Sequence, residues 1–187
     1  MNILVVTGSV RPQSVNEKMV PVVVQALQQK GAEVTVADLR ELDLPFFNNP
    51  VPPSDPRFAP TDEKVLRWTE LVANTDGVVL VTPEYNHTMS PVQMNAIDWI
   101  YKEWQDKPVA LVGYGWRSGA GQAHATAREA LAVNLKVRVG DNQANLFFMK
   151  ELNPDGSVAD EESLKKKIGS ALDELFSMVN SRNQNTL

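Results

Sequence analysis

The sequence predicts an α/β protein with a doubly wound, five-stranded parallel sheet and helices on both of its faces. Three observations favour this class. Short apolar runs alternate five times with segments of helical periodicity, as strands do when right-handed helical crossovers join them. The run at 77–81 is apolar on both faces, which is typical of a central parallel strand. The 187 residues are enough for one buried core, so we expect a single domain over 1–187.

The first two strands are expected at 3–6 and 34–37, with a helix between them. Apolar residues at helical spacing indicate that helix, and Gly31 is the expected C-terminal cap. Pro21 lies inside it and predicts a kink or a delayed start, because proline lacks a backbone donor. The stretch 40–60 holds six prolines, so we expect a structured surface loop there and no helix.

The second half of the chain continues the alternation of helices and strands. In chain order we expect a helix capped by Thr61 or Asp62, a strand at 77–81, a helix at 91–101, a strand at 108–112, a helix at 120–133, a strand within 136–148, a turn at 153–156 and an amphipathic helix carrying apolar residues from 164 to 176. The polar tail at 180–187 is expected to fray.

The composition excludes several classes of function. The chain has no cysteine and two histidines, which excludes disulfides, thiolate chemistry and iron–sulfur ligation and argues against zinc. We therefore expect no metal, and any redox chemistry needs a non-thiol cofactor. The formal net charge is −5 and the longest basic run is the triplet 165–167, so nucleic acid is not an expected partner. Without a basic leader or an apolar run of membrane-spanning length, we expect a cytoplasmic protein and no membrane partner.

The loop between the first strand and the first helix gathers donors suited to a phosphate. Ser9, Ser14 and Asn16 offer side-chain hydrogen bonds, and Arg11 offers a charge-assisted one. The helix that follows adds free N–H groups and a partial positive charge. The alternative is that Ser14 only caps the helix, with Glu17 completing a capping box.

The loop after the third strand offers a surface for a flat heteroaromatic ring. With strand order 2-1-3-4-5, the loops after strands one, three and four share one rim of the sheet. Pro83 stiffens the exit of its strand, Tyr85 supplies a flat face with a polar tip, and Asn86 has both donor and acceptor atoms. The alternative for this segment is an ordinary turn with an exposed tyrosine.

The loop after the fourth strand is rich in glycine. Gly113, Gly115 and Gly119 would allow the backbone to approach such a ring closely, and Tyr114 or Trp116 would cover part of it.

Other polar and aromatic residues receive no catalytic role. We expect His87 to be a partly exposed loop residue, His124 to be structural or solvated, and Glu84 to position its loop through its backbone. Trp99 and Trp104 are expected in the core or in a subunit contact.

These segments resemble the NADPH-dependent FMN reductase family of flavodoxin-like proteins, which includes quinone, azo-dye and chromate reductases. The resemblance covers about residues 3–139 and is carried by the segments 8–16, 38–45, 83–86 with 95–99, and 117–119. It implies that the FMN phosphate is held by Ser9, Arg11, Ser14, Val15 and Asn16, that the isoalloxazine is lined by Pro83, Glu84, Tyr85 and Asn86, and that its other edge is closed by Gly113, Tyr114, Gly115, Ser118 and Gly119.

The resemblance also implies an activity and an assembly. The expected enzyme passes two electrons from NADPH or NADH through bound FMN to a small acceptor, which is a quinone, an azo compound, free flavin or an oxidised metal ion. The flavin carries the chemistry, so no catalytic side chain is named. Homodimers or homotetramers are expected. Three residues depart from the family pattern: Met94 stands at a common lysine, and Trp116 and Ala120 stand at usual glycines.

Two rival functions stay open at the level of the sequence. One is an FMN-binding electron carrier or flavin sensor without efficient NAD(P)H turnover. The other is a nucleotide-binding module that uses Asp38 to hold a ribose, although the chain lacks the Gly-x-Gly-x-x-Gly turn after its first strand.

Overall fold

The computed structural model describes residues 1–184, and it confirms the parallel sheet with strand order 2-1-3-4-5. The five strands that form this order are β1 (Asn2–Thr7), β2 (Glu33–Ala37), β3 (Gly77–Pro83), β4 (Pro108–Gly115) and β5 (Arg138–Val139). Every pairing between neighbouring strands is parallel. Strands β3 and β4 are buried along their whole length, as expected for central strands covered on both faces.

The fifth position of the sheet is split between two short strands, which corrects the expectation of one strand. β5 pairs with the start of β4, and β6 (Ala144–Phe147) pairs with the end of β4, where Gly115 lies opposite Phe147. Between them the chain leaves the sheet, and the N–H groups of Asp141 and Asn142 donate to Glu174 at 2.9 and 2.6 Å. The split brings the aromatic end of β6 to the carboxyl edge of β4.

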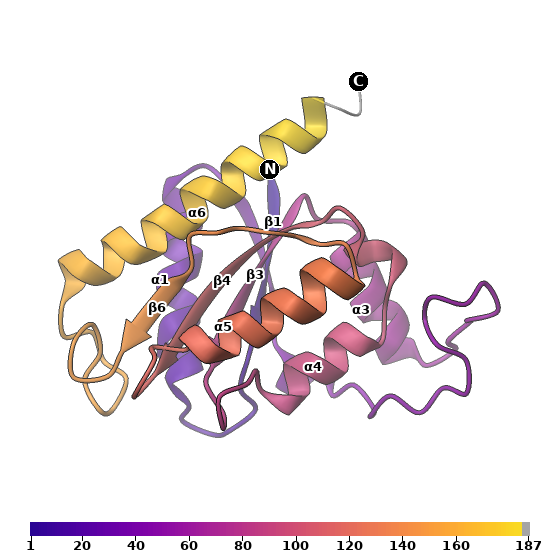
Figure 1. Cartoon of the computed structure of the whole chain (residues 1–187), viewed down its shortest axis with the longest axis horizontal. Helices are drawn as coiled ribbons and strands as arrows, with labels where there is room; N and C mark the ends of the chain where they lie inside the picture. The colour runs from indigo at the N-terminus through magenta and orange to yellow at the C-terminus, as the bar shows by residue number, and fades with distance from the viewer. Residues whose placement is uncertain (185–187) are drawn as a thin grey trace.

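Helices cover both faces of the sheet (Figure 1). α1 (Val15–Gln29) and α6 (Glu161–Gln184) pack on one face. The other face is covered by α3 (Glu63–Ala73), α4 (Pro91–Asp98) and α5 (Gly121–Arg128). The core therefore forms two apolar layers, one on each side of the strands. None of the helices within residues 1–184 is long and apolar enough to span a membrane.

The first helix is continuous across Pro21 and begins at Val15, so the expectation of a delayed start is wrong. Its C-terminus confirms the expected role of Gly31, which has φ +83°. The N–H of Gly31 donates to Gln28 O, and the N–H of Ala32 donates to Leu27 O. These two bonds form a Schellman motif, which satisfies the last carbonyl groups of the helix.

Residues after β2 form a one-turn helix, α2 (Leu39–Leu42), so the predicted loop begins only at Asp43. Asp38 causes the difference because its carboxylate accepts the Arg40 N–H at 2.9 Å and caps the turn. The remainder, up to residue 60, contains no helix, as predicted, and no strand. It extends away from the sheet (Figure 1).

Three other boundaries differ from the predictions. α4 ends at Asp98, and a separate 3₁₀ turn, η1 (Lys102–Trp104), follows it. α5 ends at Arg128 and continues as a π-helix, η2 (Glu129–Asn134). α6 extends to Gln184, so the predicted fraying is wrong for 180–184, and 185–187 lie outside the described residues.

The predicted Asp62 cap is present, with its carboxylate accepting the N–H of Lys64 at 2.8 Å. Trp99 and Trp104 are core residues, as one of the two predicted roles required.

Candidate functional site

The loops after β1, β3 and β4 meet at the carboxyl edge of the sheet, as predicted from the strand order. The hydroxyl groups of Ser9 and Tyr85 share a hydrogen bond of 3.1 Å, which joins the first loop to the second. The N–H of Glu84 donates to Tyr114 O at 3.1 Å, which joins the second loop to the end of β4. Gly8 allows the first loop to lie close to β3, because a Cβ at this position would collide with Val81 O and the Pro83 ring.

Ser14 leaves a buried hydroxyl without a partner at the N-terminus of α1. Its Oγ is inaccessible and makes no hydrogen bond within residues 1–184. The capping-box alternative is therefore wrong: Ser14 forms no side-chain cap, and the Glu17 carboxylate binds Arg40 instead, at 2.9 Å. Val15 and Asn16 are the first two residues of the helix, so their N–H groups have no acceptor inside it.

Arg11 lies beside this helix end and is exposed. Its guanidinium makes no ion pair or hydrogen bond with the described part of the chain. A free cation, a buried hydroxyl and free N–H groups at the positive end of a 15-residue helix form a set of donors suited to anionic oxygens.

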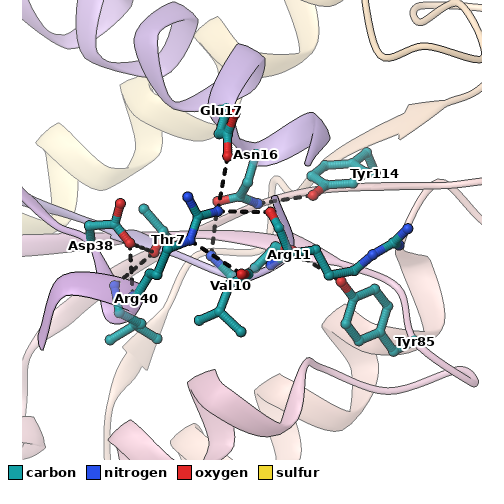
Figure 2. Close-up of polar contacts among 12 residues, drawn as sticks. Thr7, Val10, Arg11, Asn16, Glu17, Asp38, Arg40, Tyr85 and Tyr114 are labelled. Atoms are coloured by element: carbon teal, nitrogen blue, oxygen red, sulfur yellow. Dashed lines mark hydrogen bonds and ion pairs between the residues drawn. The ribbon is translucent and has the colours of Figure 1, made fainter. Parts of the chain in front are cut away.

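Asn16 has a different role from the predicted side-chain contact with a phosphate. Its Oδ1 accepts the Gly8 N–H at 2.9 Å, and its Nδ2 donates to Val81 O at 3.1 Å and to the Tyr114 hydroxyl at 3.0 Å. Figure 2 shows the Asn16 amide and the Tyr114 hydroxyl joined in this way. The side chain thus links the ends of β1, β3 and β4, and only the backbone N–H of Asn16 remains for a ligand.

Tyr114 is part of the interior and does not cover a ring at the rim, which corrects one of the two predicted covers. It is buried among the residues under α1 and α6, and burial raises the pKa of its phenol to about 12. Its hydroxyl is already bonded to Asn16.

The segment after β3 folds into a tight two-residue turn. The N–H of Tyr85 donates to Thr88 O and the N–H of Thr88 to Tyr85 O, both at 3.0 Å. Asn86 and His87 at the tip have φ values of +50° and +66°, as a type I′ turn requires. Tyr85 is half-buried with its hydroxyl on Ser9, so the alternative of an exposed tyrosine is wrong. His87 is exposed, as predicted.

Glu84 joins the loops after β3 and β4 with its side chain as well as with its backbone. Its carboxylate accepts a hydrogen bond from the Ser118 hydroxyl, and its other oxygen lies 3.6 Å from His87 Nδ1. The side chain is 8% exposed. The sequence predicted only the backbone role, because nothing local indicates that the carboxylate turns toward residue 118.

The three glycines of the β4 loop are required for packing within the protein, and their predicted approach to a ring stays a prediction. A Cβ on Gly113 would collide with Ala120 and His124, and one on Gly115 would press on Glu84. Gly119 has φ +60°, and its Cβ would lie 2.8 Å from the Phe147 ring. The side-chain positions that the glycines leave vacant are thus occupied by other parts of the chain.

His124 is structural, as one of the two predicted roles required. It is completely buried, and its Nδ1 lies 2.6 Å from Asn145 Oδ1. Burial lowers the pKa of its imidazole to about 4, so the ring is neutral at neutral pH.

The three departures from the family pattern lie in different surroundings. Met94 is half-buried against the apolar layer under α3 and α4. Ala120 is buried with φ +77°, a backbone conformation that glycine adopts more readily. Trp116 is 60% exposed, and its ring stacks at 4.7 Å on Phe148, which follows β6. The sequence analysis did not identify Phe148 as a residue of the rim, although two consecutive phenylalanines at 147–148 could have indicated an aromatic contact there.

The NADPH-dependent FMN reductase family matches residues 1–148. The chain belongs to this family. The match extends beyond the resemblance over 3–139 and includes β6. As an FMN reductase family member, the chain has relatives that are themselves NAD(P)H-dependent enzymes.

Three similar proteins illustrate the range of the family. An NAD(P)H-dependent FMN reductase of Nectria sp. is 28% identical, over 95% of this chain and 96% of its own length. A quinone reductase of Pseudomonas putida is 29% identical, over 72% of each chain. Among solved structures, the flavoenzyme NAD(P)H:(acceptor) oxidoreductase FerB of Paracoccus denitrificans is 28% identical, with a TM-score of 0.75 over 96% of this chain and 97% of its own.

Proposed function

We propose that this chain binds FMN at the carboxyl edge of its sheet and passes two electrons from NADPH or NADH to a small acceptor. One observation carries the proposal: the buried Ser14 hydroxyl, at the N-terminus of α1, has no partner within residues 1–184. Arg11 adds an exposed guanidinium to the same loop. Buried polar groups without a partner are rare in folded proteins, and an anionic ligand at this helix end would supply the acceptor that the Ser14 hydroxyl lacks. The family membership supports FMN as that ligand.

The phosphate end of FMN would be held by the loop between β1 and α1. The dianion would receive hydrogen bonds from Ser14 and from the N–H groups of Val15 and Asn16, and a charge-assisted bond from Arg11. The partial positive charge of the helix end favours the same anion.

The isoalloxazine end would lie between the loops after β3 and β4. Glu84 fixes these loops to each other through the Ser118 hydroxyl and Tyr114 O, so their relative position is set before a ligand binds. When bound, FMN supplies the hydride acceptance and the two-electron chemistry that the protein side chains lack.

Protons would come from solvent, because none of the acidic or imidazole side chains considered at this edge within residues 1–184 is poised to donate one. His124 is buried and neutral, and Glu84 is bonded to Ser118. His87 lies in the open at the tip of its turn. This arrangement supports the prediction that no catalytic side chain is needed.

The acceptor that fits this rim best is a planar conjugated compound such as a quinone. Trp116 presents an exposed indole backed by Phe148, and a flat acceptor can stack on such a face. The quinone reductase of Pseudomonas putida supports this class.

We also propose that the chain acts as a homodimer or homotetramer. Large apolar side chains are exposed at Phe46, Val133 and Met149, with exposed fractions of 77%, 72% and 71%. Light scattering on the purified protein tests this, and a monomer at micromolar concentration would contradict it.

Titration of apo-protein with FMN and with riboflavin, followed by flavin fluorescence, tests the site. Ser14→Ala removes a hydroxyl that makes no hydrogen bond to any residue from 1 to 184, so the described fold loses none. We expect this variant to bind FMN about tenfold more weakly and riboflavin, which lacks the phosphate, unchanged. Ser54→Ala, an exposed serine of the loop after α2, is the matched control. Full FMN affinity in Ser14→Ala and Arg11→Met would contradict the phosphate site.

Steady oxidation of NADPH by the FMN-loaded protein with benzoquinone tests the activity. The rival electron carrier predicts bound FMN without this turnover.

A further inference from the structure

Arg40 of α2 binds the outer side of the loop that would hold the FMN phosphate. Its Nε donates to Val10 O at 3.2 Å, and its Nη2 donates to Arg11 O at 2.8 Å and to the Glu17 carboxylate at 2.9 Å. Figure 2 shows the guanidinium among these three oxygens. The contacts join α2, the loop and the first turn of α1, although Arg40 lies about thirty residues further along the chain than Val10.

These bonds determine where the loop's own donors point. The Val10–Arg11 peptide is trans, so its C=O and N–H point in opposite directions. Because Arg40 holds the carbonyl on the outside, the Arg11 N–H turns inward, where it donates to Ser9 Oγ at 3.3 Å. Ser9 in turn bonds the Tyr85 hydroxyl. The guanidinium therefore orders a chain of hydrogen bonds that ends at the loop after β3.

Arg40 also changes the electrostatics of the helix end. Glu17 lies in the first turn of α1, close to where a phosphate would bind. An unpaired carboxylate there would repel a dianion, and the Arg40 guanidinium compensates that charge.

The backbone of Arg40 is anchored to the end of β1. The Thr7 hydroxyl oxygen accepts the Leu39 N–H at 3.0 Å and donates to Asp38 at 3.5 Å. Asp38 accepts the Arg40 N–H at 2.9 Å. The one-turn helix is thus anchored to the same strand that leads into the phosphate loop, so the guanidinium and the loop keep a fixed relation.

We propose that Arg40 is a positioning residue that preorganises the phosphate loop for FMN and offsets the charge of Glu17. The inference rests on the proposed FMN site. The hydrogen bonds of the Arg40 guanidinium go to the loop backbone and to Glu17, so we infer that it acts through the loop and not on the cofactor.

Two substitutions at Arg40 test the inference by flavin titration of the apo-protein. Arg40→Met removes both the charge and the donors, and Arg40→Lys keeps the charge but cannot bridge three oxygens with a planar fork. We expect about tenfold weaker FMN binding in Arg40→Met and a smaller but measurable loss in Arg40→Lys. Riboflavin affinity should fall much less than FMN affinity, because the phosphate would contact this loop directly, whereas the loop after β3 is linked to Arg40 only through Ser9 and Tyr85.

Arg57→Met is the matched control, since Arg57 is an exposed arginine that pairs with Asp55 far from the rim. It should bind both flavins as the unmodified chain does. Thermal unfolding of each apo-variant checks that the fold is kept, and Arg40→Lys remains available if Arg40→Met does not fold.

Two results would overturn the inference: unchanged FMN affinity in both folded Arg40 variants, or an equal loss of FMN and riboflavin affinity, which indicates a general structural role. Failure of the proposed function has a different signature. In that case the unmodified chain itself binds FMN no better than riboflavin, or binds neither.

Discussion

Glu151 is a buried carboxylate from which a pH-dependent loss of stability can be worked out. It lies in the turn after β6, and its side chain is 6% exposed. It accepts hydrogen bonds from the Phe147 N–H at 2.9 Å, the Ser163 hydroxyl at 2.9 Å and the Lys167 ammonium at 2.7 Å. These contacts fasten the end of β6, next to the candidate site, to the first turns of α6.

The pKa of Glu151 gives the size of this effect. Burial by itself raises the pKa of the carboxyl, but the bonds from Lys167, Phe147 and Ser163 together outweigh it and lower the pKa from 4.5 to about 2. The difference corresponds to about 3 kcal/mol of stability at pH 7. Because the folded pKa is depressed, this contribution is fully present above about pH 4.5 and is lost as the pH falls toward 2.

We therefore expect Glu151→Gln to lower the free energy of unfolding by about 3 kcal/mol at pH 7 and by about 2 kcal/mol at pH 3.5. Urea unfolding of both proteins at the two pH values measures the difference. Glu161→Gln is the control, because Glu161 pairs with Lys165 in solvent and its loss should change stability little. An equal effect of Glu151→Gln at both pH values would refute the electrostatic reasoning, since a packing defect does not titrate.

Further predictions concern the rim, two glycines and a buried lysine. Trp116→Gly should raise the KM for benzoquinone severalfold and leave that for ferricyanide, which cannot stack, unchanged; equal changes in steady-state assays would exclude the stacking role. Gly119→Ala should destabilise the fold by about 2 kcal/mol, because φ is +60° and the new methyl meets the Phe147 ring at 2.8 Å. Gly169→Ala in α6, where the methyl meets nothing within 4 Å, should instead stabilise it by up to about 1 kcal/mol; thermal melts that ranked the two variants in the opposite order would contradict both assignments. Burial lowers the pKa of Lys107, which donates to Val72 O and Thr75 O, from 10.5 to about 8. Between pH 8 and 10.5 the unfolded chain binds more protons than the folded one, so the free energy of unfolding should rise with pH, and more steeply than in Lys107→Met. Urea unfolding at several pH values measures both slopes, and equal slopes would count against this reasoning.

Much of the fold could be predicted because its signals are local. The apolar runs of β1, β3 and β4, the helical spacing in α1 and α6, and the αL position of Gly31 each depend on residues close in sequence. The boundaries that were wrong have local causes that compete with propensity. The Asp38 cap formed a helix where prolines predicted a loop, and the polar stretch 140–143 divided the fifth strand.

The candidate site was predictable as a set of loops but not as a set of contacts. The loop between β1 and α1 and the turn after Pro83 were visible as donor-rich segments after strands. The partner of each side chain was not: Asn16 bonds Val81 and Tyr114, 65 and 98 residues away in the chain. Nothing near Arg40 in the sequence indicates that it binds the loop at 10–11.

The sequence by itself determined the fold class, the order of the elements and the kinds of chemical group at the rim. Those properties follow from periodicity, turn chemistry and composition, which act over a few residues. Only the tertiary structure decided which of these polar side chains form hydrogen bonds within the described residues and which do not. Ser14 and Asn16 are two residues apart and both are polar, yet the fold surrounds the Asn16 amide with hydrogen-bond partners and gives the Ser14 hydroxyl none among residues 1–184. Because such partners come from distant strands, a polar side chain that links strands can be told from one that is left unpaired only when the sheet is assembled.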